Sequence, residues 1–80
     1  MTNVTLYSTG TCPYCVAAES LLKKRGITAI EKIRVDQSTA AFDEMINRSG
    51  RKSVPQIYIN EQHVGGFDDL VKFDAAGKLQ

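Results

Sequence analysis

The stretch VTLYSTGTCPYC, at residues 4–15, carries the clearest structural signal in the chain. Residues 4–7 form a short β-rich run, and a polar loop follows it. A helix is expected next, with Thr11 or Cys12 near its N-cap and Pro13 at its first position, where a fixed φ and a missing N–H are tolerated. The stretch therefore predicts a strand, a loop and a helix that opens on two cysteines spaced C-x-x-C.

The rest of the sequence continues this alternation of strands and helices. The first helix has alanine and leucine at four-residue spacing and ends at three cations followed by Gly26. Further elements are expected as a strand at residues 30–35, a helix that ends at residues 49–50, strands at residues 56–59 and 63–64, and a helix that opens at residues 68–69 and closes at Gly77. The order βαβαββα predicts an α/β fold with a four-stranded mixed sheet and helices on both faces.

Length and charge exclude several functional classes. Eighty residues correspond to one small domain, expected to span residues 1–80. Ten cations against nine anions give a net charge of +1, which argues against nucleic acid as a partner. No run approaches the ~20 apolar residues of a membrane span. The first residues lack a signal-peptide pattern, so we expect a cytoplasmic protein with no membrane partner. We also expect a monomer.

The two cysteines, Cys12 and Cys15, are the most informative residues in the composition. A secreted disulfide scaffold would need four or more cysteines. A closed zinc site would need four ligands, and the only other soft ligand is His63, which we expect to be exposed on an edge strand and to have no role as a base. The pair is therefore either a redox dithiol or half of a metal site shared with another molecule, and we expect no metal site within the chain.

Three motifs in order resemble a known family. They are CPYC at residues 12–15, SVP at residues 53–55 and GGFDDL at residues 65–70. Together with the βαβαββα order they resemble a dithiol glutaredoxin of the compact bacterial type, which has the thioredoxin-like fold. The resemblance covers nearly the whole chain. Thioredoxin itself is a poorer match, because that family carries Trp-Cys-Gly-Pro-Cys and this chain has no tryptophan.

The spacing of the cysteines indicates how they would divide the chemistry. Cys12 is the candidate nucleophile, since backbone N–H groups at a helix N-terminus stabilise a thiolate. A lowered pKa there improves Cys12 as a leaving group more than as an attacking group. Cys15, one turn further into the helix, is the candidate resolving thiol. A bridge between them closes a tiny loop and contributes only about 2 kcal/mol, which favours reducible chemistry over a structural staple.

The resemblance also implies a glutathione site whose residues come from three segments. They are Tyr14, Arg51, Val54, Pro55, Gly66, Phe67 and Asp68. In this family the matching proline is cis and faces the dithiol, and the backbone of the residue before it pairs with the cysteinyl part of glutathione. The matching arginine meets the glycyl carboxylate. The tyrosine ring is expected beside the sulfur.

The last segment of this site lies before the third helix. Gly66 permits close backbone approach, and the Phe67 N–H with Asp68 would hold the γ-glutamyl end. Other roles stay open from the residues alone. Asp68 could be a simple N-cap, Arg51 a solvated loop charge and Tyr14 an exposed spacer.

One position departs from the family pattern. Many glutaredoxins carry lysine three residues before the first cysteine, where this chain has Thr9. Ionisation of Cys12 should then depend more on the helix terminus, and glutathione should bind more weakly. Lys24 and Lys52 are the candidates to supply the missing cation.

The resemblance implies a glutathione-dependent thiol–disulfide oxidoreductase. It would reduce protein disulfides and protein–glutathione mixed disulfides, with glutathione as co-substrate and no tightly bound cofactor. Ribonucleotide reductase is one client that the family allows. Two alternatives remain. The first is an electron donor reduced by thioredoxin reductase, favoured by Thr9. The second is a carrier of an iron–sulfur cluster ligated by glutathione, disfavoured by Pro13.

Overall fold

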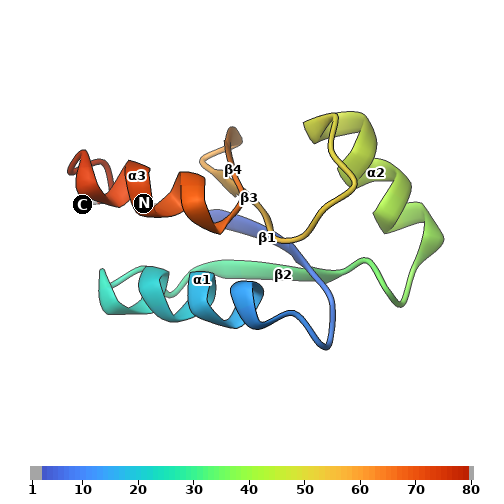
Figure 1. The fold of residues 1–80 in the computed structure, drawn as a ribbon, viewed down its shortest axis with the longest axis horizontal. Coiled ribbons are helices and arrows are strands. Elements are labelled where there is room, and N and C mark those ends of the chain that lie inside the picture. The colour runs from blue at the N-terminus through green and yellow to red at the C-terminus, as the bar shows by residue number, and fades with distance from the viewer. Residues whose placement is uncertain (1–2, 80) are drawn as a thin grey trace.

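The computed structural model describes residues 3–79, which form four strands and three helices in the predicted order (Figure 1). The elements are β1 (Val4–Ser8), α1 (Pro13–Lys24), β2 (Ile30–Arg34), α2 (Thr39–Ser49), β3 (Gln56–Ile59), β4 (Gln62–Gly65) and α3 (Phe67–Ala75). The predicted boundaries differ by a residue or two, mainly because β4 is longer than expected and α3 begins one residue earlier. Within the described residues, no helix is long and apolar enough to cross a membrane.

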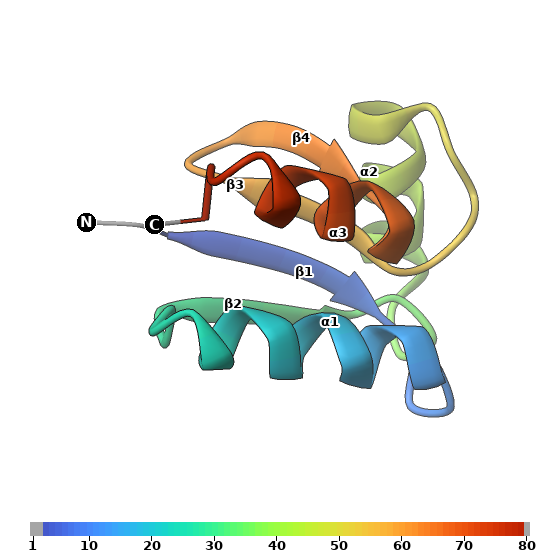
Figure 2. The same cartoon turned by 60° about the vertical axis from the view of Figure 1, so that its left-hand side comes forward.

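The sheet has the strand order β2-β1-β3-β4. Strand β1 pairs in parallel with β2 and antiparallel with β3, and β3 pairs antiparallel with β4, so the sheet is mixed as predicted. Helices α1 and α3 cover one face and α2 covers the other (Figures 1 and 2). This is the thioredoxin-like arrangement that the sequence predicted.

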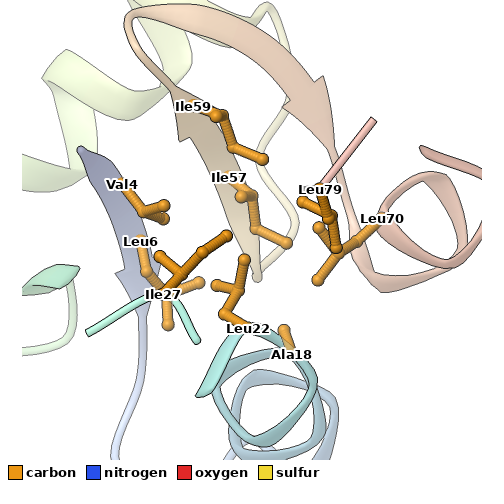
Figure 3. Packing of buried hydrophobic residues seen from close by; sticks show 9 residues of the cluster. All are labelled: Val4, Leu6, Ala18, Leu22, Ile27, Ile57, Ile59, Leu70 and Leu79. Carbon is orange, nitrogen blue, oxygen red and sulfur yellow. The ribbon is translucent and has the colours of Figure 1, made fainter. Parts of the chain in front are cut away.

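Each face of the sheet buries its own hydrophobic cluster, because successive side chains of a strand point to opposite faces. The cluster under α1 and α3 is shown in Figure 3 and consists of Val4, Leu6, Ala18, Leu22, Ile27, Ile57, Ile59, Leu70 and Leu79. The cluster under α2 consists of Tyr7, Val35, Met45 and Tyr58. The first of these clusters fixes α1 against the sheet, so that its first residue follows directly from the loop at the carboxyl end of β1.

Candidate active site

The dithiol turn, residues 12–15, opens α1 as predicted. Cys12 is the N-cap, with an extended backbone at φ −100° and ψ 104°, and Pro13 occupies the first turn. The Cys15 N–H donates to the Cys12 sulfur at 3.2 Å. A cap side chain normally accepts such a bond through oxygen, so here the sulfur of Cys12 takes the place of a capping oxygen. In this geometry the Cys15 N–H group points at the Cys12 sulfur, which would carry the negative charge of a thiolate.

The two cysteines differ in their surroundings. Both are free thiols, and Cys12 is half-buried whereas the Cys15 side chain is 2% exposed. Burial, followed by the hydrogen bond with Cys12, raises the pKa of Cys15 from its ordinary value of 9.0 to about 12, against a smaller lowering by the Thr9 backbone. Cys15 is therefore a protonated thiol in the resting dithiol, and Cys12 is the sulfur that an incoming disulfide can reach.

The Val54–Pro55 peptide bond faces the dithiol turn. It is cis, as the resemblance implied. The Val54 carbonyl oxygen lies 3.9 Å from the Cys12 sulfur, although 42 residues separate them in the chain. A substrate bound along the Val54 backbone would therefore lie next to Cys12.

A groove of about 330 Å³ begins beside this contact. Its lining residues are Tyr14, Arg51, Ser53, Val54, Pro55, Gly66, Phe67, Asp68 and Asp69. All seven residues expected to contact glutathione are among them, and Ser53 and Asp69 are additional. The rings of Tyr14 and Phe67 lie against each other, with centroids 6.0 Å apart. The groove thus joins an aromatic wall to a polar wall.

Asp69 organises the polar wall, although it is not among the residues predicted to form the site. Its carboxylate accepts from the Gly66 N–H at 3.1 Å and from the Arg51 guanidinium at 3.2 Å. Both interactions lower the pKa of Asp69, the Gly66 bond more than Arg51. Gly65, at φ +120°, leaves the space that the carboxylate fills, since any Cβ there would collide with it.

The start of α3 corrects one alternative reading of Asp68. The N-cap of α3 is Gly66, and it is Asp69, three residues further on, whose carboxylate satisfies the cap backbone. Asp68 is therefore not the cap, and its exposed side chain lines the groove. An acid three residues after a glycine at a helix start is a sequence pattern that could have identified Asp69.

A carboxylate holds the loop before Cys12. The Gly10 N–H donates to Asp36 at 3.1 Å, and Arg34 holds the same carboxylate through two bonds of 2.7 and 2.8 Å. Lys24 cannot replace the missing cation near Thr9, because it ends α1 about 18 Å along the helix axis from Cys12. Lys52 is exposed and does not line the groove.

The lone histidine is not exposed, which corrects the sequence-based expectation. His63 lies half-buried on β4, with its ring against that of Tyr58 at 4.9 Å between centroids. Its Nε2 lies 2.9 Å from the side-chain oxygen of Gln56. Hydrophobic patterning missed this contact because it joins two strands.

A second hollow lies at the opposite end of the sheet. It has a volume of about 790 Å³ and is lined by Asn3, Val4, Thr5, Thr28, Ala29, Ile30, Glu31, Asn60 and Glu61. None of these lining residues is a thiol or a cation. Although it is larger, this hollow lacks the chemistry that the groove beside Cys12 offers.

Comparison with known proteins identifies the family to which the chain belongs. The family model described as Glutaredoxin matches residues 4–64. Glutaredoxin 3 of Escherichia coli is 48% identical over 79 residues, which cover 99% of this chain and 94% of that protein. The solution structure of glutaredoxin from Brucella melitensis superposes with a TM-score of 0.83 at 40% identity, over 99% of this chain and 85% of that one.

A structure with bound glutathione is also similar. The buckwheat glutaredoxin–glutathione complex has a TM-score of 0.85 at 26% identity, over 98% of this chain and 73% of that chain. Fold, dithiol and sequence similarity over nearly the whole length all agree. The chain therefore belongs to the glutaredoxin family, whose members are glutathione-dependent thiol oxidoreductases.

Proposed function

We propose that this glutaredoxin reduces protein–glutathione mixed disulfides and protein disulfides, with Cys12 as nucleophile, Cys15 as resolving thiol and glutathione bound in the groove. The observation that carries the proposal is the contact between Cys12 and Val54 at the edge of a groove with a cation and a helix N-terminus. A tripeptide with two carboxylates and one ammonium matches such a groove.

The groove residues would bind different parts of glutathione. The Val54 backbone, before the cis bond to Pro55, would pair with the cysteinyl residue and set its sulfur beside Cys12. Arg51 would meet the glycyl carboxylate. The Phe67 N–H, in the first turn of α3, would meet the γ-glutamyl carboxylate, and Asp68 the ammonium. Gly66 leaves room for glutathione to approach the backbone, and the Tyr14 ring would cover the bound glutathione.

Reduction of a mixed disulfide needs Cys12 alone. The Cys12 thiolate attacks the glutathione sulfur, a new Cys12–glutathione disulfide forms, and the client protein leaves as a thiolate that takes up a proton. A second glutathione thiolate then attacks the glutathione sulfur bound to Cys12. Oxidised glutathione leaves, and the Cys12 thiolate returns.

Reduction of a protein disulfide uses both cysteines. The Cys12 thiolate attacks one client sulfur and forms a mixed disulfide with it, while the client S–S bond breaks and the first client thiolate leaves and takes up a proton. Cys15 loses its proton and attacks the Cys12 sulfur, which forms the Cys12–Cys15 disulfide and releases the second client thiolate. Two glutathiones reduce this disulfide and become oxidised glutathione. Ribonucleotide reductase is a client that could be tested in this reaction, with the glutaredoxin acting as a monomer.

The experiment measures NADPH consumption with glutathione, glutathione reductase and a small mixed disulfide of glutathione. We expect rapid turnover that shows Thr9 is tolerated in place of lysine. The matched assay replaces the glutathione system with thioredoxin reductase. Turnover only in that second assay would contradict the proposal and favour an electron donor reduced by thioredoxin reductase.

A further inference from the structure

Hydrogen bonds through one buried side chain join His63 to the loop that forms one wall of the groove. Gln56, the first residue of β3, is 1% exposed. Its side-chain nitrogen donates to the Ser53 carbonyl at 2.9 Å and to the Ser53 hydroxyl at 3.3 Å. On the other side of the amide, His63 Nε2 contacts the Gln56 oxygen at 2.9 Å. His63 is thus connected to the loop without lining the groove.

The Ser53 carbonyl fixes the direction of these bonds. A carbonyl only accepts hydrogen bonds, so the Gln56 amide must turn its nitrogen toward Ser53 and its oxygen toward His63. The imidazole must then carry its proton on Nε2, because the Gln56 oxygen cannot donate. His63 therefore acts as the donor to the buried Gln56 side chain.

His63 is itself held in a fixed position. Its backbone pairs with Tyr58 across β3 and β4, and its ring lies against the Tyr58 ring with an interplanar angle of 34°. The Arg48 guanidinium lies 4.1 Å from the Tyr58 ring centroid, and Tyr58 is buried. Packed strands thus hold the donor atom, His63 Nε2, whereas Ser53 and Val54, which it would position, lie in a loop.

We propose that His63 is a positioning residue for the glutathione groove. Acting through Gln56, it holds Ser53, and through Ser53 it holds the Val54 carbonyl that faces the Cys12 sulfur. This inference rests on the proposed function, since it assigns the Val54 backbone to substrate. The role concerns where substrate lies, so it should act on KM and leave the sulfur chemistry of Cys12 unchanged.

The test compares two substitutions of His63. His63→Phe keeps a ring against Tyr58 and removes the donor, whereas His63→Gln restores a donor. With a glutathione mixed disulfide, we expect His63→Phe to raise KM about fivefold and to change kcat by less than about twofold, because the side-chain oxygen of the buried Gln56 is left without a partner. We expect His63→Gln to recover most of that change. The matched control is Gln62→Ala, an exposed neighbour on β4, with both constants unchanged.

A second readout does not depend on glutathione. The backbone amide NMR signals of Ser53 and Val54 should shift in His63→Phe and return toward their original positions in His63→Gln, while those of Thr9 and Gly10 stay in place. If His63→Phe is unfolded at the assay temperature, Gln56→Met replaces it, since it removes the same connection.

The outcomes separate this inference from the proposed function. If wild-type protein turns over but His63→Phe leaves both KM and the Ser53 and Val54 signals unchanged, the positioning role is wrong. A fall in kcat at unchanged KM would also overturn it. If wild-type protein shows no glutathione turnover, the proposed function fails, and the NMR signals still decide whether His63 holds the loop.

Discussion

The dithiol turn and the groove lie side by side, but the chain builds them in different ways. The dithiol turn is made of four consecutive residues. Its characteristic hydrogen bond runs from the Cys15 N–H to the Cys12 sulfur, within one helical turn. The groove combines the loop before β3 with the start of α3. Its polar wall depends on a contact between Arg51 and Asp69, 18 residues apart.

This difference suggests which kinetic constant each region controls. The dithiol turn supplies the reacting sulfurs, so substitutions there should act on kcat. The groove supplies contacts to parts of the substrate that do not react, so substitutions there should act mainly on KM. The predictions below test whether the two regions can be separated in this way.

The largest effect is expected for Cys12→Ser. A serine hydroxyl stays protonated where a thiolate would attack, so kcat should fall at least about a thousandfold for every substrate. A serine oxygen still caps α1 by accepting from the Cys15 N–H, so the thermal unfolding midpoint should change little. Coupled NADPH consumption and thermal unfolding measure the two effects. Residual turnover of one-tenth or more would mean that another group attacks.

Cys15→Ser should affect the reduction of protein disulfides but not the reduction of glutathione mixed disulfides. Because only the second step of the dithiol reaction needs Cys15, turnover of a glutathione mixed disulfide should stay within about threefold of wild type. Reduction of a protein disulfide that requires the internal Cys12–Cys15 bridge should be lost. Both reactions are followed with the same coupled assay. Equal loss of both would contradict the assignment of Cys15 as resolving thiol.

Arg51→Ala tests the groove alone. Removing the cation that we assign to the glycyl carboxylate should raise KM for the mixed disulfide about tenfold with little change in kcat, since a charge-assisted hydrogen bond is lost. Lys52→Ala is the matched control, because Lys52 is an adjacent exposed cation that does not line the groove. A similar rise of KM in both variants would show that general positive charge matters and that the position of Arg51 does not.

The same contrast explains how far the sequence could predict the molecule. Strand and helix patterns, the proline at the start of α1 and the C-x-x-C spacing are local signals, and they predicted the order of elements and the dithiol turn. The position of Pro55 opposite Cys12 came from family resemblance. No periodicity joins Arg51 to Asp69, or His63 to Gln56, because these contacts depend on how separate elements pack.

The wrong prediction that His63 is exposed has a physical reason. A short polar strand near a turn is typical of a solvent-exposed sheet edge, and His63 was accordingly expected to be exposed. Its burial depends on the Tyr58 ring across the strand pair and on a buried glutamine that needs a partner. Both conditions arise only when β3 and β4 are already paired.

The smallest effect is expected outside both regions, at the tether between Gly10 and Asp36. The asparagine in Asp36→Asn can still accept from the Gly10 N–H, but it loses the charge that holds Arg34 through two bonds. The tether lies on the surface, so the thermal midpoint at pH 7 should fall by only about 2 °C and kcat/KM by about twofold.

The pH dependence of that difference identifies its cause. The bonds from Arg34, followed by the bond from Gly10, lower the pKa of Asp36 from its ordinary value of 3.8 to about 2. A carboxyl whose pKa is lower in the folded state stabilises that state above pH 4, and the contribution is lost as pH falls toward 2. The midpoints of wild type and Asp36→Asn, measured by thermal unfolding, should therefore converge over this range. A difference that stays constant from pH 7 to pH 2 would mean that shape, and not the charge of Asp36, holds the loop before Cys12.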